Sequence, residues 1–487
     1  MHILKVIGII LEVVILFNFI IVVHELGHFL AAKWRGLKVD KFQIWFGKPL
    51  WSKTIGGVQY GLGCIPAGGF VALPQMAPME MLEGSTDDGK PLAPIKPIDK
   101  IIVAIAGPLF SFALALTFAM LVWLIGHPVS KQETTRTIGN IAEGAAVGAD
   151  QLKPGDEILE IDGRKVERWQ GMVDSVVWNV VSSQDETIPF KVDRPGVGIV
   201  DDIEVTPVAP APPKDQKWYQ GLFKRKELRR VGISPAYQPM VARVFPDSPA
   251  DRAGLQANDV VVGLNGGALY HPNEISNFIN ANPGQALTLS VERLERGEKQ
   301  SVDLQLTPEI PTNYKGTENE RHMIGTVWDS TGETSLEHPH PVTQIKQTVQ
   351  TMINTLQAVF SPKSEIKAQH LAGPVMIMRV YYLLFEAPDG WRRAIWFSVL
   401  LNVNLGILNL LPLPVLDGGH ITMATVEAIR RKPINLRFLE IVQTASALLL
   451  IGFMIYVTGF DLGDWFGEKK AEAQGAPNPI FSEVVPN

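Results

Sequence analysis

Cysteine is nearly absent from this chain, because Cys64 is the only one in 487 residues. A single thiol excludes an intramolecular disulfide and any site built on paired cysteines, so the compartment has to be inferred from topology. The chain also lacks a basic stripe interleaved with aromatic side chains, and its formal net charge is −6. These absences argue against a nucleic-acid partner.

Long apolar runs are what the chain does contain. Hydrophobic residues make up 46% of it, which indicates membrane spans diluted by a sizeable soluble part, and three or four structural units are expected at this length. A helix needs about 20 apolar residues to cross a bilayer. Four runs are long enough, at roughly residues 7–32, 101–125, 394–415 and 438–458. The first is much longer than a signal-peptide core, so we interpret it as a span.

The first apolar run carries His24, Glu25 and His28 in the order HExxH. On a helix the two histidines share a face, so both imidazoles can reach one metal ion with Glu25 beside it. Zinc suits such ligands, and a catalytic zinc keeps one position for a water whose pKa falls to about 7. The motif therefore predicts a hydrolytic zinc site inside a membrane span, near one membrane face.

The third run ends in a second informative stretch, NLLPLPVLDGGH, from Asn409 to His420. An ionisable group at membrane depth is costly and is by default a functional-site hypothesis, so Asp417 is the predicted third metal ligand. His420 is the rival ligand, for which we favour a supporting or structural role. Pro412 and Pro414 cannot extend a helix, and the carbonyls they free have to line a cavity or meet another segment.

Basic residues predict the topology. They follow the first and third spans, where they are Lys33, Arg35, Lys38, Lys41, Lys48, Lys53, Arg430, Arg431, Lys432 and Arg437. By the positive-inside rule both of these loops are cytoplasmic, so both termini and the large middle segment are extracytoplasmic. Arg392 and Arg393 are the contrary sign. The two halves of the predicted site then lie near the same, cytoplasmic face.

Between the first two spans, short aromatic and β-branched runs alternate with glycine and proline, which predicts hairpins. Lipid tolerates such backbone only where its hydrogen bonds are met, so we expect a paired sheet dipping toward the site. Its edge would hold an extended substrate by strand addition, with Gly68, Gly69 and Phe70 as the predicted contacts. A plain cytoplasmic hairpin is the alternative.

The middle segment contains an internal repeat, because residues 145–163 align without a gap on residues 248–266. Both copies resemble PDZ domains, with an Asp-Gly or Asn-Gly hairpin at equivalent places. In the second copy, the stretch Arg230-Val231-Gly232-Ile233 precedes the core and is similar to a PDZ carboxylate-binding loop. It assigns Val231, Gly232 and Ile233 as peptide contacts of that copy. The first copy has only Thr137-Ile138-Gly139-Asn140, and a purely structural role for both copies is the alternative.

Taken together, HExxH, the Gly107-Pro108 pair of the second span, the paired PDZ-like units and the stretch ending in Asp417 resemble the site-2 protease family of intramembrane zinc metalloproteases. The resemblance is to the bacterial branch that serves the extracytoplasmic stress response. One departure is Ser111, where the family often has asparagine, and we expect it to affect local packing only.

The resemblance implies roles for individual residues and partners. His24, His28 and Asp417 would bind Zn²⁺, Glu25 would be the general base, and Asn409 would hold the substrate backbone or the developing oxyanion. The implied substrates are single-span membrane proteins already trimmed on the outer side by a site-1 protease, such as anti-sigma factors, together with remnant signal peptides. The PDZ-like pair would act as a size filter.

Two other functions are alternatives to an intramembrane protease. A non-catalytic membrane scaffold presenting PDZ modules is the main alternative, and the intact Glu25 and Asp417 argue against it. A transporter would predict internally repeated spans, which the sequence lacks.

The predicted architecture is a multi-pass α-helical protein of the inner (plasma) membrane, in contact with the lipid bilayer, with four transmembrane helices, a membrane-associated β-hairpin region and two α+β PDZ-like domains. In chain order we expect a first transmembrane helix (1–33), a cytoplasmic or re-entrant hairpin loop (34–99), a second transmembrane helix (100–126), a first PDZ-like domain (128–209), a linker (210–228), a second PDZ-like domain (229–312), surface helices (340–390), a third transmembrane helix (392–416), a cytoplasmic loop (417–437), a fourth transmembrane helix (438–458) and a disordered tail (459–487).

Overall fold

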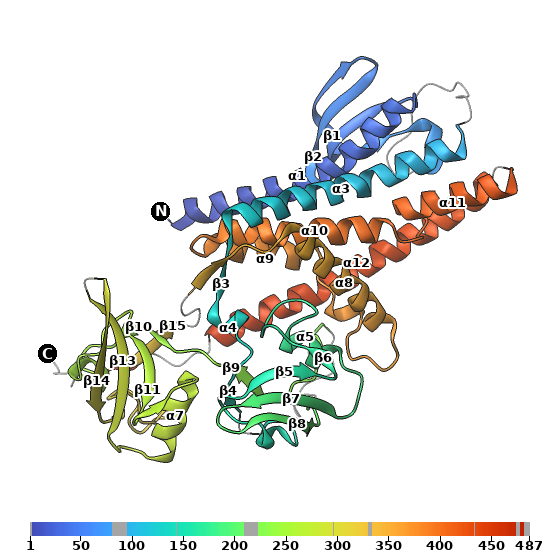
Figure 1. Cartoon of the computed structure of the whole chain (residues 1–487). Helices are drawn as coiled ribbons and strands as arrows, with labels where there is room; N and C mark the ends of the chain where they lie inside the picture. The colour runs from blue at the N-terminus through green and yellow to red at the C-terminus, as the bar shows by residue number, and fades with distance from the viewer. Residues whose placement is uncertain are drawn as a thin grey trace. The chain divides into compact units, whose positions relative to one another are not determined.

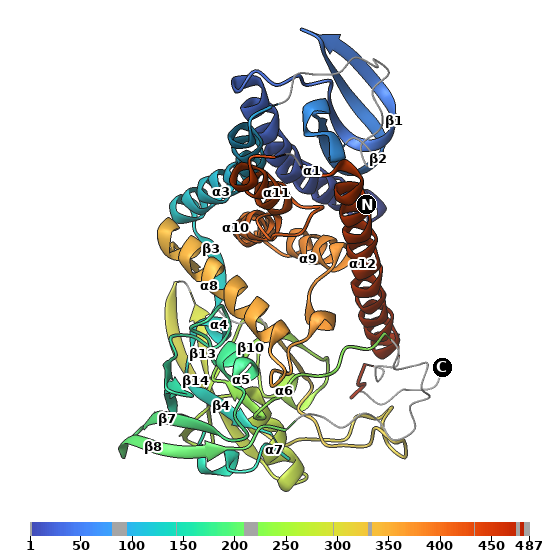
Figure 2. The same cartoon turned by 90° about the vertical axis from the view of Figure 1, so that its right-hand side faces the viewer.

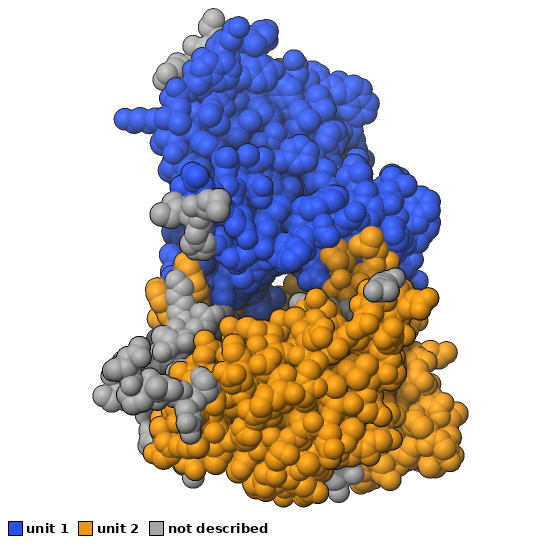
Figure 3. Space-filling view, turned by 90° about the vertical axis from the view of Figure 1, so that its left-hand side faces the viewer, with its two compact units in different colours: residues 1–127, 337–354, 368–462 blue, residues 128–336, 355–367, 463–487 orange. Residues whose placement is uncertain are grey.

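The computed structural model describes residues 2–79, 95–142, 144–208, 223–295, 297–329, 334–432, 434–473 and 478–481. The chain forms two compact units (Figure 3). The first comprises residues 1–127, 337–354 and 368–462, and the second comprises residues 128–336, 355–367 and 463–487. Most of the predicted linker at 210–228 lies outside the described residues.

Helices dominate the first unit. They are α1 (His2–Trp34), α3 (Pro97–Ile125), α8 (Pro341–Phe360), α9 (Pro374–Glu386), α10 (Gly390–Asn409), α11 (Asp417–Arg430) and α12 (Leu436–Ala473). Helix α3 lies at the centre, packed against α1, α10 and α11 (Figure 1). Among the described residues, three helical stretches are long and apolar enough to cross a membrane, at 4–34, 97–125 and 437–466.

The third expected span differs from its prediction. Helix α10 ends at Asn409 and α11 begins at Asp417, so the helix does not reach Val415 as its apolar run suggested. The cause is local, because Pro412 and Pro414 lack the N–H groups a continuing helix needs. Helix α10 is not among the three stretches of span length.

The chain end also differs from its prediction. Helix α12 continues to Ala473 instead of ending near residue 458. Asp461 of this helix is buried, and its Oδ2 accepts a hydrogen bond from the backbone N–H of Met376 at 3.0 Å, at the start of α9. Gly373 leaves room for this contact, since a Cβ there would lie 2.6 Å from Oδ2 of Asp461. Part of the expected tail is therefore helix that is packed in the first unit.

The expected hairpin region is one long antiparallel hairpin of β1 (Lys41–Ile55) and β2 (Val58–Ala72), followed by a 3-10 turn at Pro74–Met79. Its two-residue turn is Gly56-Gly57, with φ of 59° and 81°, a backbone region that glycine enters at no steric cost. The base of the hairpin lies beside the end of α1, where Phe29 and Val71 share one buried cluster (Figure 2).

The second unit contains two α+β repeats, each with its own hydrophobic core. The first has β4 (Ile138–Ile141), β5 (Glu157–Ile161), β6 (Arg164–Lys165), α5 (Val176–Ser182), β7 (Ile188–Arg194), β8 (Gly198–Val205) and β9 (Ile233–Pro235). The second has β10 (Met240–Val244), α6 (Pro249–Arg252), β11 (Val260–Leu264), β12 (Gly267–Ala268), α7 (Pro272–Ala281), β13 (Leu287–Glu295), β14 (Glu298–Leu306) and β15 (Thr326–Asp329). Short strands β3 (His127–Ser130) and β16 (Thr334–Glu337), helix α4 (Lys131–Thr134) and 3-10 turns at Ala149–Gln151 and Ala368–His370 complete the described elements.

The same ion pair occurs in both repeats. Asp156, fully buried, accepts from Nη2 of Arg194 at 2.7 Å, and the equivalent Asp259 accepts from Nη2 of Arg293 at 2.6 Å. In each pair the hydrogen bond with the carboxylate raises the pKa of the arginine. The alignment of residues 145–163 with 248–266 thus corresponds to matching elements and to a matching buried charge pair.

The segment Arg230–Ile233 lies in the first repeat, although the sequence suggested the second. Strand β9 pairs with β4, and Val231 is part of the first core. The backbone carbonyls of Val231 and Gly232 accept hydrogen bonds from Ala146 and Ala142 at 3.0 and 2.8 Å. Burial and register decide which strands pair. Proximity in the chain therefore does not show to which repeat this segment belongs.

The second repeat obtains its equivalent strand from a later part of the chain. Strand β15 pairs with β10, as β9 pairs with β4, and it follows Ile324-Gly325 as β9 follows Val231-Gly232. In each repeat this strand, β9 or β15, is therefore the last element of the repeat in chain order. The first repeat extends beyond the expected residue 209 to take in β9, and the second extends beyond residue 312 to β15.

Candidate metal centre

Two helices from opposite ends of the chain bring together three side chains of the types that bind metal ions. His24 and His28 lie one turn apart on α1, and Asp417 is the first residue of α11. All three are at least nine-tenths buried. In the described part of the chain, this is the group of His, Cys, Asp and Glu side chains whose ligand atoms gather closely enough to share an ion.

The three side chains form a triangle in which each imidazole faces a different oxygen of the Asp417 carboxylate. Nε2 of His24 lies 3.3 Å from Nε2 of His28 and 3.3 Å from Oδ2 of Asp417, while Nε2 of His28 lies 3.4 Å from Oδ1 of Asp417. Zinc binds nitrogen and oxygen at about 2.0–2.1 Å, and the edge of a tetrahedron is about 1.6 times that length, so ligands of one zinc lie about 3.3–3.4 Å apart. Each of these three separations therefore matches the edge of a zinc tetrahedron.

The second nitrogen of each imidazole has its own partner. Nδ1 of His28 faces the carbonyl of Val103 at 2.8 Å, so it carries the proton, and Nδ1 of His24 lies 2.9 Å from the hydroxyl of Ser111. Both partners lie on α3. Such contacts fix the ring orientation and direct the free Nε2 lone pair of a histidine at a metal.

Without a cation, this arrangement would be unfavourable. Nε2 of His28 presents a lone pair to the carboxylate of Asp417, and Oδ2 of Asp417 is buried with no hydrogen-bond donor in the described residues. Buried acceptors are normally satisfied, so an orphaned carboxylate oxygen facing imidazole lone pairs indicates a missing positive charge. The donor set, two imidazoles and a carboxylate, is the kind that zinc takes in catalytic sites.

Glycine at position 107 makes room for the two imidazoles. A Cβ on Gly107 would lie 2.1 Å from Nε2 of His28 and 2.8 Å from Nε2 of His24. Gly27, inside the HExxH motif, serves the same contact from α1, since its Cβ would lie 2.4 Å from the carbonyl oxygen of Ala106. The close approach of α1 and α3 therefore depends on these two glycines.

The hairpin reaches the remaining residue of the motif. A Cβ on Gly69 of β2 would lie 3.7 Å from Cγ of Glu25, and the Glu25 carboxylate is hydrogen-bonded by the backbone of Val71. Glu25 thus lies between the metal-binding triangle and strand β2. This is the position from which a carboxylate can serve both a water molecule and an extended chain paired with the strand.

The structure does not join every predicted residue to this group. Asn409 is the half-buried last residue of α10, and its side chain makes no hydrogen bond with any described residue. His420 is buried on α11 but lies outside the triangle. Phe70 stacks on Phe46 with ring centroids 6.1 Å apart, and Gly68, at φ +73°, leaves room for the same Phe46 ring. Val231, Gly232 and Ile233 belong to the second unit.

The sequence interpretation missed two contributors. Ser111 was expected to affect packing only, yet its hydroxyl contacts a histidine of the triangle. Gly107 was noted only as part of a motif, without its role of admitting the imidazoles. The one available signal was spacing, because positions 107 and 111 are four apart and share a face of α3.

A helix of membrane-spanning length that carries two of the three side chains of this triangle, with a glutamate beside them, is the arrangement of a zinc metalloprotease embedded in the membrane. A comparison with family models agrees, because the model for peptidase family M50 matches residues 12–453. The chain belongs to this family.

Individual relatives agree with this assignment. The chain is 27% identical to the regulator of sigma E protease of Salmonella typhi, over 91% of this chain and 95% of that protein. It is 28% identical to the regulator of sigma-E protease RseP of Escherichia coli K12, over 89% and 94% of the two chains. A Vibrio cholerae protein named for zinc metalloprotease activity is 26% identical, over 91% and 95%. The prediction of a zinc-dependent intramembrane protease is confirmed.

Proposed function

We propose that His24, His28 and Asp417 hold the zinc ion and that Glu25 is the general base of peptide-bond hydrolysis. The observation that carries this assignment is the separation of 3.3–3.4 Å between ligand atoms of each pair of these three side chains. His420, outside the triangle, has a supporting role.

The chemistry divides between the ion and the chain. When bound, zinc would polarise the scissile carbonyl and lower the pKa of a water molecule. Glu25 takes a proton from that water molecule as the oxygen of the water adds to the carbonyl carbon. Glu25 then passes the proton to the amide nitrogen as the C–N bond breaks. Ser111 and Val103 keep the imidazoles in orientation, and Asn409 donates to the substrate carbonyl as negative charge develops on its oxygen.

The substrate is an extended stretch of a transmembrane segment. A helix satisfies its own backbone hydrogen bonds in lipid, so its cleavage requires local unwinding, and the freed groups need new partners. Strand β2 supplies them by strand addition along Gly68, Gly69 and Phe70. The proximity of Gly69 to Glu25 supports this, because a chain paired there passes the general base.

The names of the relatives support the proposed substrate class. Several are named regulators of sigma-E protease, which supports single-span anti-sigma-factor-like substrates, trimmed first by a site-1 protease, and remnant signal peptides. The charge bias of the loops supports four spans in the inner membrane, with both termini and the two repeats on the extracytoplasmic side. The metal site would then lie near the cytoplasmic face.

The two repeats act as PDZ-like modules that filter or bind the trimmed substrate. In the first repeat a pocket of about 420 Å³ lies between α5 and the Arg229–Ser234 segment, lined by Trp169, Val176 and Val180 and by Gly232. Apolar side chains facing a glycine-containing backbone loop suit the end of an extended peptide. Val231, Gly232 and Ile233 therefore serve the first repeat in this role.

The test uses Glu25→Gln protein in liposomes with a single-span model substrate, offered with and without its outer domain. Zinc content should stay at the wild-type level while cleavage of the trimmed substrate disappears. Glu12→Gln, an exposed glutamate in the same helix, is the matched control and should remain active. Full activity of Glu25→Gln would refute the assignment, and equal cleavage of both substrate forms by the wild type would refute the filter.

A further inference from the structure

The chain returns to the second repeat after its last helix. Residues 478–481 lie against the loop between β14 and β15, where the backbone of Ile480 is held at both ends. Its carbonyl accepts from the N–H and the Oγ1 of Thr312 at 2.7 and 2.8 Å, and its N–H donates to Oδ1 of Asn313 at 2.9 Å. Nδ2 of Asn313 also donates to the carbonyl of Asn478 at 2.9 Å.

Recognition combines an extended backbone with one aromatic side chain. The side chain of Ile480 is exposed at 42%, so the surface contacts its backbone rather than its side chain. Phe481 packs against Gly325, where a Cβ would lie 2.9 Å from Cε2 of the ring. An asparagine that pairs with both an N–H and a C=O of a strand-like segment makes the contact specific for extended chain.

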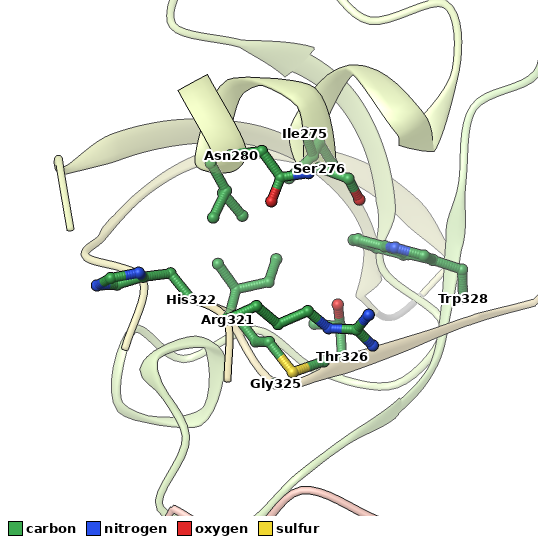
Figure 4. Close-up of a pocket in the computed structure, with 11 residues that line it drawn as sticks. Ile275, Ser276, Asn280, Arg321, His322, Gly325, Thr326 and Trp328 are labelled. Atoms are coloured by element: carbon green, nitrogen blue, oxygen red, sulfur yellow. The ribbon is translucent and has the colours of Figure 1, made fainter. Parts of the chain in front are cut away.

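The same loop forms a wall of a pocket in the second repeat. Figure 4 shows this pocket, of about 250 Å³, between Ile275 and Asn280 of α7 and the segment from Arg321 to Trp328. Gly325 lines the pocket, while the segment 478–481 contributes nothing to its described lining. Glu309 and Met323 exchange backbone hydrogen bonds of 3.0 and 2.8 Å, which join the Thr312 end of the loop to the pocket wall.

We propose that residues 478–481 form an intramolecular strap whose docking surface is Thr312, Asn313 and Gly325. The strap holds the chain beyond α12 on the second repeat and stiffens the wall of the pocket in this repeat. The occupant is the chain's own carboxyl-terminal segment, because it is seated there and only four residues separate it from Ala473, where α12 ends. So short a tether gives an effective concentration on the order of millimolar. The strap does not depend on peptidase activity.

Amide hydrogen exchange on the full-length protein in detergent tests the strap. Ile480→Pro removes the N–H that Asn313 accepts, and Asn313→Ala removes the partner itself. Asn313→Ala should raise exchange at Ile480, and both substitutions should raise exchange across residues 309–325 by about tenfold, because the loop loses its contact with the strap. Ile480→Ala keeps the backbone contacts, and Asn319→Ala changes a nearby asparagine outside the contact, so both controls should match the wild type.

A second arm uses a chain ending at Ala473. Protection of residues 309–325 should fall while that of β11 and β13 stays, which shows that the repeat remains folded. A synthetic peptide of residues 474–487 at millimolar concentration should restore the lost protection. Exchange at Ile480 as fast as in an unstructured chain, no effect of Ile480→Pro, or failure of the peptide to restore protection would each overturn the proposal.

Discussion

At the scale of single residues, the site depends on groups that are not among the proposed metal ligands. Ser111 is fully buried and contacts Nδ1 of His24, while the carbonyl of Val103 contacts Nδ1 of His28. The carbonyl of Val103 selects the tautomer of His28 in which Nε2 is free, and the hydroxyl of Ser111 can accept from Nδ1 in the same tautomer of His24. Their contribution should therefore appear in metal affinity before it appears in the fold.

Ser111→Ala should weaken zinc binding by about 10–100-fold, the usual cost of losing a partner of a ligand histidine. Chelator competition on the purified protein measures this without any activity assay. Ser111→Asn restores a hydrogen-bonding group and should recover most of the affinity. Thr117→Ala removes an exposed hydroxyl from the same helix and should change nothing; equal zinc affinity in Ser111→Ala and the wild type would exclude the role of this contact.

His271 controls a pH-dependent contact in the second repeat. Burial lowers the pKa of His271 to about 4 from 6.5. Its Nδ1 accepts from the N–H of Asn273 at 3.1 Å at the start of α7, while Glu274 accepts from the N–H of His271 at 2.9 Å. Protonation would remove the acceptor, so the folded repeat disfavours it.

The sign of the resulting pH dependence follows from the lowered pKa. Between pH 6.5 and 4 the unfolded chain binds this proton and the folded chain does not, so stability is complete above pH 6.5 and falls as the pH drops toward 4. We expect a loss on the order of 1–3 kcal/mol in the unfolding free energy of this repeat. His271→Asn keeps an acceptor that does not titrate, and hydrogen exchange in β11 and β13 at pH 7.5 and pH 5 should show a smaller pH effect in that variant. An equal effect in both proteins would contradict the assignment.

At the scale of the elements, glycines determine how closely the membrane helices approach α3. Besides Gly27 and Gly107, Gly406 of α10 faces Phe112, where a Cβ would lie 2.9 Å from Cε2 of the ring. In lipid, helix association depends on close packing, because apolar side chains gain nothing by leaving a hydrocarbon solvent. These small residues thus position the metal-binding side chains of α1 and α11 around α3.

Gly107→Ala should abolish zinc binding although the residue is no ligand, because its methyl group would occupy the space of both Nε2 atoms. The substitution favours the helix itself by about 1 kcal/mol, so a weaker helix cannot explain the loss. Zinc per mole of purified protein is the measurement. Gly8→Ala in α1 meets nothing within 4 Å and should keep its zinc, whereas a fully metallated Gly107→Ala protein would disprove the close contact.

At the scale of the whole molecule, each repeat is completed by a strand that comes late in the chain. Val231→Ala should destabilise the first repeat by about 1–3 kcal/mol, as expected for a cavity in its core, and increase hydrogen exchange in β5 and β7. Exchange in β11 and β13 should stay unchanged. Ile324→Ala, the equivalent change in the second core, should give the reverse pattern. Faster hydrogen exchange in the second repeat of the Val231→Ala protein would show that the segment Arg230–Ile233 belongs to the second repeat.

Much of the site could be predicted from the sequence because its signals are local. The spacing of His24, Glu25 and His28 places them on one helix, and an acidic Asp417 beside an apolar run is costly without a function. Ser111, Gly107 and the strand β9 could not be assigned in the same way. Their roles depend on which helix or strand lies opposite them, and neither periodicity nor composition contains that information.

The sequence by itself determined that the chain carries a zinc protease motif in membrane-spanning helices, with a repeated soluble part. Helix periodicity, hydropathy and charge bias act over neighbouring residues, so they are legible without a fold. Only the tertiary structure decided that Asp417 completes a zinc-sized triangle, that Ser111 holds His24, that Val231 serves the first repeat and that residues 478–481 return to the second. These are contacts between residues far apart in the chain, and packing of complementary surfaces selects them.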